Sequence, residues 1–482
     1  GSLRHVARFA EARQAMVACG GVAALVATAQ VKGLDAHGRR EACMALAQLS
    51  CAPHSEAVAA AGGSEVLIEA VRRDGGCAAG DRGGVAQAAA AALEELVVCE
   101  AGKRAVLAGG VGPCVQLLQS SQEAVQRHAL TILEHVAAGA DGQAAVGEAG
   151  GVQSLVRLAC SRNAAVVPAA TGILCCLSER AGELPSLIAS GAARPLVGWL
   201  GDAEVARQAR AVAAVRRLSG AQHGGEMAVV EAGGVGPLVR LLRGGGAAQA
   251  EAMHAVHNLA RCVESRRAVA AAAEAVAACV DVLRSPVEET VKEHAAATVA
   301  ALCDADRRPD VVAAGGVEEL ALLLDSWSVP CQLHAVRAMS SLAQDQSSHA
   351  RLVSAGLSQM VQLGGGTPSQ AGVFALALLH KLATGGDEGA QAAVASSEAA
   401  VGLLVSQLGG SLAEQQAAAG SLRHVARFAE ARQAMVACGG VAALVATAQV
   451  KGLEGGKVNG RRDACLVLAA LSCAPHSEAV AA

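Results

Sequence analysis

Hydrophobic residues recur along the chain at the three- and four-residue spacing of helices that bury one face. In the stretch 225–265, Leu238, Leu241 and Leu242 form one such set, and Val256 and Leu259 belong to the next. Glycine pairs interrupt the pattern between the sets. The spacing therefore predicts three helices here, at 226–231, 236–242 and 248–262.

This three-helix pattern repeats. A small residue followed by Gly-Gly-Val opens the second helix at 20–22, 109–111, 150–152, 233–235, 315–317 and 439–441. Weaker versions place Ser64, Ala192, Val276, Leu357 and Val401 at the valine position, so successive repeats are 40 to 47 residues apart. The glycines allow a sharp turn, because a positive φ is cheap only without a Cβ. A fixed period of this length predicts a helical solenoid.

The period divides the chain into eleven complete repeats of about 42 residues at 11–475, with a partial repeat at 1–10 and the start of another at 476–482. We predict a single solenoid over residues 1–482. Since such a repeat cannot bury its apolar face alone, the truncated ends indicate a segment of a longer array. Residues 1–34 recur letter for letter at 420–453, which indicates a duplication or an error in gene assembly.

The segments EAGGVGPLVRLL and AVHNLA, at 231–242 and 255–260, resemble the armadillo repeat family, and the pattern covers the whole chain. The resemblance implies an all-α, right-handed superhelix of three-helix repeats. It also implies that the third helices line a concave groove for extended peptides or other protein surfaces. Members of this family are scaffolds and adaptors, not enzymes.

The nuclear-import branch of that family carries a Trp and, four residues later, an Asn on each third helix. We compare the two equivalent positions, four residues apart, on the third helix of every repeat of this sequence, and call them the two rows. Only Asn258 fits, and His254 stands where the tryptophan would be. Binding of nuclear import signals is therefore disfavoured. The rows contain one acid, Glu95, against seven basic residues, which are Arg4, Arg8, Arg217, Arg337, Lys381, Arg423 and Arg427.

A groove lined by these residues, with His254 and Asn258, would prefer acidic partners. The alternative is that the arginines only solvate a helix face.

Composition narrows the function further. A net charge of −4 and 1% aromatic residues argue against nucleic-acid binding. The 16 cysteines form no CxxC pair, which favours buried thiols in a reducing, cytoplasmic compartment. Apolar runs such as 268–280 are too short and too rich in alanine for a membrane span. We expect no cofactor and no catalytic site, and no metal site, because His254 and His257 lack further ligands.

These observations predict a non-enzymatic protein–protein interaction scaffold. The chain has 33 Arg against 6 Lys, 4 Ile and 3 Asn, which suggests a GC-rich genome such as those of some green algae. Armadillo arrays of ciliated algae include components of the axonemal central apparatus. We therefore expect a structural protein of the cilium, with tubulin tails or neighbouring scaffold proteins as partners. The alternative is a substrate-recognition segment of a larger ubiquitin ligase or other regulatory protein.

Overall fold

The computed structural model describes residues 10–31, 34–50, 54–75, 81–221, 224–304, 306–366, 368–450 and 459–472. These residues form helices and turns, with no strand among them. The chain divides into two compact units, Gly1–Leu238 and Val239–Ala482, and the division falls inside α18. The single solenoid predicted over residues 1–482 stays a prediction.

The first unit contains the repeats that we number 1 to 5, and the start of repeat 6. Their helices, in chain order, are α2 (Ala10–Ala18), α3 (Gly21–Gln30), α4 (Ala36–Leu49), α5 (Ser55–Ala60), α6 (Gly63–Asp74), α7 (Asp81–Leu96), α8 (Glu100–Ala105), η1 (Val106–Gly110), α9 (Val111–Leu117), α10 (Glu123–Ala137), α11 (Ala140–Glu148), α12 (Gly151–Ala159), α13 (Val167–Leu177), η2 (Ala181–Glu183), α14 (Leu184–Ala189), α15 (Ala193–Gly198), η3 (Trp199–Gly201), α16 (Val205–Ser219), α17 (Gly225–Glu231) and α18 (Val235–Leu241).

The second unit continues with the third helix of repeat 6 and with repeats 7 to 11. Its helices are α19 (Gly246–Arg261), α20 (Val263–Ala271), α21 (Ala275–Arg284), α22 (Glu289–Asp304), α23 (Arg308–Ala313), α24 (Gly316–Leu323), α25 (Val329–Leu342), η4 (Gln346–Ser348), α26 (His349–Gly365), α27 (Gln370–Thr384), α28 (Glu388–Ser396), α29 (Glu398–Ser406), η5 (Gln407–Gly409), α30 (Leu412–Val425), α31 (Ala429–Ala437), α32 (Gly440–Gln449) and α33 (Gly460–Leu471).

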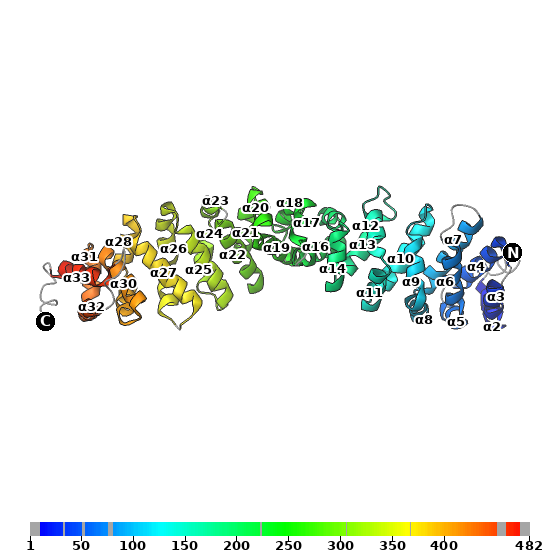
Figure 1. Cartoon of the computed structure of the whole chain (residues 1–482), viewed down its shortest axis with the longest axis horizontal. Helices are drawn as coiled ribbons and strands as arrows, with labels where there is room; N and C mark the ends of the chain where they lie inside the picture. The colour runs from blue at the N-terminus through cyan, green and yellow to red at the C-terminus, as the bar shows by residue number, and fades with distance from the viewer. Residues whose placement is uncertain are drawn as a thin grey trace. The chain divides into compact units, whose positions relative to one another are not determined.

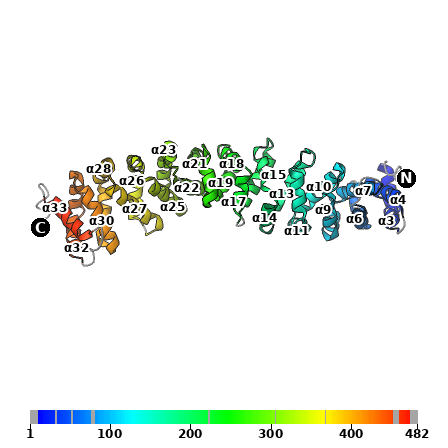
Figure 2. The ribbon, with the colours of Figure 1, turned by 45° about the horizontal axis from the view of Figure 1, so that its top comes forward.

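Within each unit, equivalent helices of successive repeats pack on one another (Figures 1 and 2). The third helices form one row in each unit, from α4 through α7, α10 and α13 to α16, and from α19 through α22, α25, α27 and α30 to α33. Their contacting faces are small and apolar: in α22, Ala295, Ala296, Val299 and Leu302 are all fully buried. Small side chains allow neighbouring helices to approach closely, so the row of third helices forms the core of each unit.

Most of the predicted glycine turns are confirmed. Gly20, Gly150, Gly233, Gly315 and Gly439 all have φ between 71° and 79°, and each directly precedes a second helix or its first residues. The pair at 109–110 differs, because both glycines lie in the π-helical segment η1, which leads directly into α9. Repeat 9 also differs. Its predicted first and second helices are one helix, α26, that passes through Gly356.

Candidate partner-binding surface

A trough lies along three adjacent third helices of the second unit, α19, α22 and α25, with one lining residue from α20. It has a volume of about 330 Å³. Ala260, Ala297, Ala300 and Ala301 form its apolar lining. Repeat 7 carries alanine at both positions of the two rows described above, Ala297 and Ala301, whereas repeats 6 and 8 carry longer side chains there or nearby. The hollow therefore results from small residues on α22 between larger residues on α19 and α25.

Charged and polar side chains surround this lining. They are His257, Arg261, Arg266, Asp304, His334 and Arg337. Within the described ranges, the guanidinium groups of Arg261, Arg266 and Arg337 make no ion pair or hydrogen bond. Asp304, the only acid of the lining, accepts a hydrogen bond of 3.0 Å from the Ser341 hydroxyl. The trough thus has three arginines without an ion pair and a single carboxylate, so its lining carries an excess of positive charge.

These arginines differ from most others in the second unit. Arg243 pairs with Glu274 at 2.7 Å, Arg284 with Glu319 at 3.0 Å, and Arg351 with Glu318 at 2.7 Å. Each of these pairs joins residues 31 to 35 positions apart, so it links one repeat to the next. Arginines elsewhere in the second unit therefore link neighbouring repeats, whereas the arginines of the trough do not.

Four histidines cluster beside the trough, on three consecutive third helices. The rings of His254 and His294 have centroids 4.1 Å apart, and those of His257 and His294 are 4.7 Å apart. Burial, followed by the charge of His294 and Arg261, lowers the pKa of His257 to about 4. Burial also lowers the pKa of His334, although Glu293 opposes this shift. Both imidazoles are therefore neutral near neutral pH and offer hydrogen bonds without a permanent charge.

The structure separates the residues predicted to line the groove. Arg337 lines the trough, and His254 and Asn258 lie on α19 beside it. Lys381 lies on α27, where burial and then Arg308 lower its pKa. Arg217 belongs to α16 of the first unit and donates a hydrogen bond of 3.5 Å to Ser178. Arg4 and Arg8 lie outside the described residues.

Arg423 and Arg427 both form ion pairs, Arg423 with the next repeat and Arg427 within its own. The Arg423 Nε lies 3.2 Å from the buried carboxylate of Asp463 on α33. Arg427 lies 3.7 Å from Glu388 and also donates a hydrogen bond to Gln391, both on α28. It follows the end of α30, whose buried residues Leu422 and Val425 show that His424 holds the position equivalent to Lys381. By this register Arg423 and Arg427 both lie three residues beyond the rows of third-helix positions, and their part in binding a partner stays a prediction.

Sequence reasoning missed Arg261, Arg266 and His334 as lining residues, and it favoured groove lining or packing over metal binding for His257 without placing it in the site. Arg261 lies three residues after Asn258, and His334 lies three residues before Arg337. Helical spacing places such residues on the same face. Extending the two rows by one helical turn in each direction would have found both.

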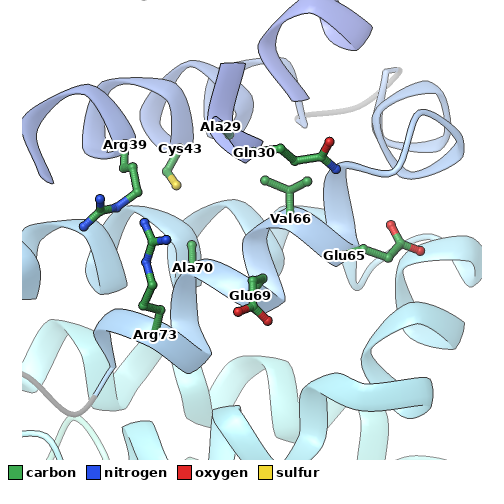
Figure 3. Close-up of a pocket in the computed structure, with 9 residues that line it drawn as sticks. All are labelled: Ala29, Gln30, Arg39, Cys43, Glu65, Val66, Glu69, Ala70 and Arg73. Atoms are coloured by element: carbon green, nitrogen blue, oxygen red, sulfur yellow. The ribbon is translucent and has the colours of Figure 1, made fainter. Parts of the chain in front are cut away.

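A second cavity, of about 310 Å³, lies in the first unit among α3, α4 and α6 (Figure 3). Figure 3 shows the guanidinium groups of Arg39 and Arg73 on one side and the carboxylates of Glu65 and Glu69 apart from them. Arg39 is engaged by Asp74, at 3.4 Å. Burial raises the pKa of the Cys43 thiol to about 12, so the thiol stays protonated. A cavity with both charges and no reactive thiolate favours no single class of ligand.

Two further features concern metals and membranes. Among the described residues, no group of three or more histidine, cysteine or acidic side chains is arranged to hold a metal ion. In the same part of the chain, no single helix is long and apolar enough to cross a membrane, whereas three bent helix pairs reach that length and composition together. Each pair is the first and second helix of one repeat, with a bend of 76° to 86° between them.

Comparisons with known proteins define the fold. No family model and no curated protein sequence matches the chain. A structure from a study of a phosphorylation switch in the cadherin and β-catenin interaction matches 98% of this chain and 100% of its own, with a TM-score of 0.65 and 17% identity. An engineered protein matches 93% of this chain and 98% of its own, with a TM-score of 0.51 and 26% identity.

A designed armadillo repeat protein matches 48% of this chain and 99% of its own, with a TM-score of 0.41 and 26% identity, too low a score to support a conclusion by itself. The chain has an all-α, armadillo-type repeat fold, as its repeat pattern predicts. At these levels of identity the similarity concerns the fold and leaves the partner open.

Proposed function

We propose that this chain is a non-enzymatic protein–protein interaction scaffold that holds an acidic, extended segment of a partner protein in the trough on α19, α22 and α25. The observation that carries the proposal is the set of unpaired arginines, Arg261, Arg266 and Arg337, around an alanine lining. The alanines leave room for the main chain of a peptide to approach the helices. Acidic side chains on that peptide would then reach the arginines from either side.

The strength of such binding follows from exposure. Arg261 and Arg337 are exposed, so each contact with a carboxylate contributes only about 0.2–1 kcal/mol and is screened by salt. Several contacts together, with an extended surface beyond the trough, support affinities on the order of micromolar. Binding should therefore weaken steeply with ionic strength.

The test uses the whole chain and a fluorescently labelled glutamate-rich peptide, with binding measured by anisotropy at several salt concentrations. Arg261→Glu and Arg337→Glu should each reduce affinity about tenfold, because each replaces an attraction by a repulsion. Arg267→Glu makes the same charge change at an exposed position outside the trough and is the matched control. Equal losses in all three variants would mean that only the overall charge matters and that the trough is not the site.

We further propose that the partners are acidic segments such as tubulin tails or neighbouring scaffold proteins of a ciliary axoneme, and that the protein lies in the cytoplasm and cilium. The basic trough and the arginine-rich composition support this proposal. Affinity purification of the intact protein from its native cells, followed by mass spectrometry, tests it. Recovery of ubiquitin-transfer enzymes instead of axonemal proteins would favour the alternative, a substrate-recognition segment of a larger ubiquitin ligase.

A further inference from the structure

The trough has chemical features that distinguish among acidic groups. We infer that it contains a subsite for a phosphorylated serine or threonine of the partner segment, formed by Arg261, Arg266 and Arg337 with His257 and His334. This inference rests on the proposed function, because it specifies which acidic group occupies the same trough. It adds that phosphorylation of the partner controls its affinity.

The first argument is the number and origin of the cations. Arg261 comes from α19, Arg266 from α20 and Arg337 from α25, so guanidinium groups border one cavity from three separate helices. One carboxylate has two oxygens, and a single bidentate arginine satisfies it. A phosphoryl group has three acceptor oxygens and a charge of about −1.5 to −2. Three arginines around one cavity match the phosphoryl group better than a lone carboxylate.

The second argument is the excess of positive charge. Elsewhere in the second unit, Arg243, Arg284 and Arg351 form ion pairs with glutamates of a neighbouring repeat. At the trough the single acid, Asp304, is engaged by Ser341, and the described residues bring no other carboxylate to its lining. Three guanidinium groups against one carboxylate leave a net positive charge at the cavity, which an external dianion offsets better than a monoanion does.

The third argument concerns the histidines. His257 and His334 both line the same cavity. A neutral imidazole can donate one N–H bond to a phosphoryl oxygen without adding a charge. The subsite thus combines charged donors from arginine with neutral donors from histidine, a set that can serve all three phosphoryl oxygens.

No other described cavity has this combination. The one among α3, α4 and α6 contains Glu65 and Glu69 beside its arginines. The one lined by Arg157 has a single arginine, which already donates a hydrogen bond of 2.9 Å to the Leu118 carbonyl. Of these three cavities, only the trough therefore offers the proposed subsite.

The test uses the whole chain and three labelled peptides of about 15 residues that share one acidic sequence and differ at a central position, which is serine, glutamate or phosphoserine. Anisotropy should show that the phosphoserine peptide binds about tenfold or more tightly than the glutamate peptide. Arg337→Ala and Arg266→Ala should reduce the affinity of the phosphoserine peptide to that of the glutamate peptide. Arg267→Ala, outside the trough, is the matched control and should leave the ranking unchanged.

A second variant separates charge from geometry. Arg337→Lys keeps the charge but loses the planar fork that binds two oxygens. It should retain binding of the glutamate peptide and lose most of the preference for phosphoserine. Far-UV circular dichroism of each variant checks that the helices are intact, which is expected because the Arg337 side chain is exposed.

The outcomes distinguish this inference from the proposed function. If the glutamate and phosphoserine peptides bind equally and both depend on Arg337, the phosphoserine subsite is wrong and the basic trough for acidic segments stands. If no peptide binds, the proposed function itself fails. If inorganic phosphate alone binds as tightly as the phosphoserine peptide by calorimetry, the trough is a small-anion site and the assignment to a phosphorylated partner is overturned.

Discussion

The turn between α23 and α24 offers a direct test of why the repeat needs two glycines. Gly315 has φ of 79°, and a Cβ added there would lie 3.4 Å from the end of Arg284, which can move. Gly315→Ala should therefore destabilise the turn by about 1–2 kcal/mol, because alanine disfavours a positive φ. Gly316 is the first residue of α24 and has a negative φ, but its Cβ would lie 2.6 Å from the Val311 Cγ1 and 3.0 Å from the Val311 carbonyl oxygen.

Val311 is fully buried, so it cannot move aside freely. Gly316→Ala should cost about 1–3 kcal/mol through overpacking. Asparagine separates the two causes. It tolerates a positive φ, so Gly315→Asn should cost less than Gly315→Ala. At position 316 a larger side chain meets the same crowded atoms, so Gly316→Asn should cost more than Gly316→Ala.

Hydrogen exchange at the amides of α23 and α24 is the suitable assay, because repeat arrays open locally and a single global unfolding energy is poorly defined for them. A loss of 1–2 kcal/mol corresponds to exchange that is about 5 to 30 times faster. If Gly316→Asn cost less than Gly316→Ala, as expected at position 315, the explanation would be refuted, because crowding would then not be what limits position 316. If amide exchange is unchanged in Gly316→Ala, the Val311 side chain does move aside and there is no overpacking.

Three further predictions follow from single contacts. Arg423→Ala leaves the buried Asp463 carboxylate without its cation and should cost about 1–2 kcal/mol of local stability, seen as amide exchange in α30 and α33 that is about 5 to 30 times faster, whereas the exposed Arg462→Ala should not. The pKa of His257 falls from 6.5 to about 4 on folding, so between these pH values the unfolded chain binds more protons than the folded chain. The free energy of unfolding should therefore fall by about 2 kcal/mol as the pH drops from 6.5 to about 4. The decrease should be smaller in His257→Gln, which cannot titrate. Burial raises the pKa of Cys114 and Cys279 to about 12, so iodoacetamide should spare both while it labels the exposed Cys160 and Cys438, as peptide mass spectrometry would show.

Local sequence was sufficient for most of the fold, because the period and the glycine turns depend on residues close to one another. The helices predicted at 226–231 and 248–262 correspond to α17 and α19, within two residues at each end. The prediction failed where a glycine has a different cause. Gly356 lies inside α26, and a Cβ there would lie 2.8 Å from the Met339 Cε. This glycine serves close packing against α25, and a single glycine in a sequence does not reveal which purpose it serves.

The candidate site was harder to predict for a related reason. Arg423 and Arg337 belong to the same rows of basic positions in the sequence, yet Arg423 is held by Asp463 and Arg337 has no partner among the described residues. The deciding residue lies about one repeat away, and its approach depends on the packing of neighbouring helices. Composition therefore predicts a basic surface, whereas only the stack shows which arginines remain for a partner. At the trough, α22 contributes the small residues Ala297 and Ala301 to the lining, and the guanidinium groups around them stay available. The loss of a side chain on one repeat thus creates the binding capacity of the two beside it.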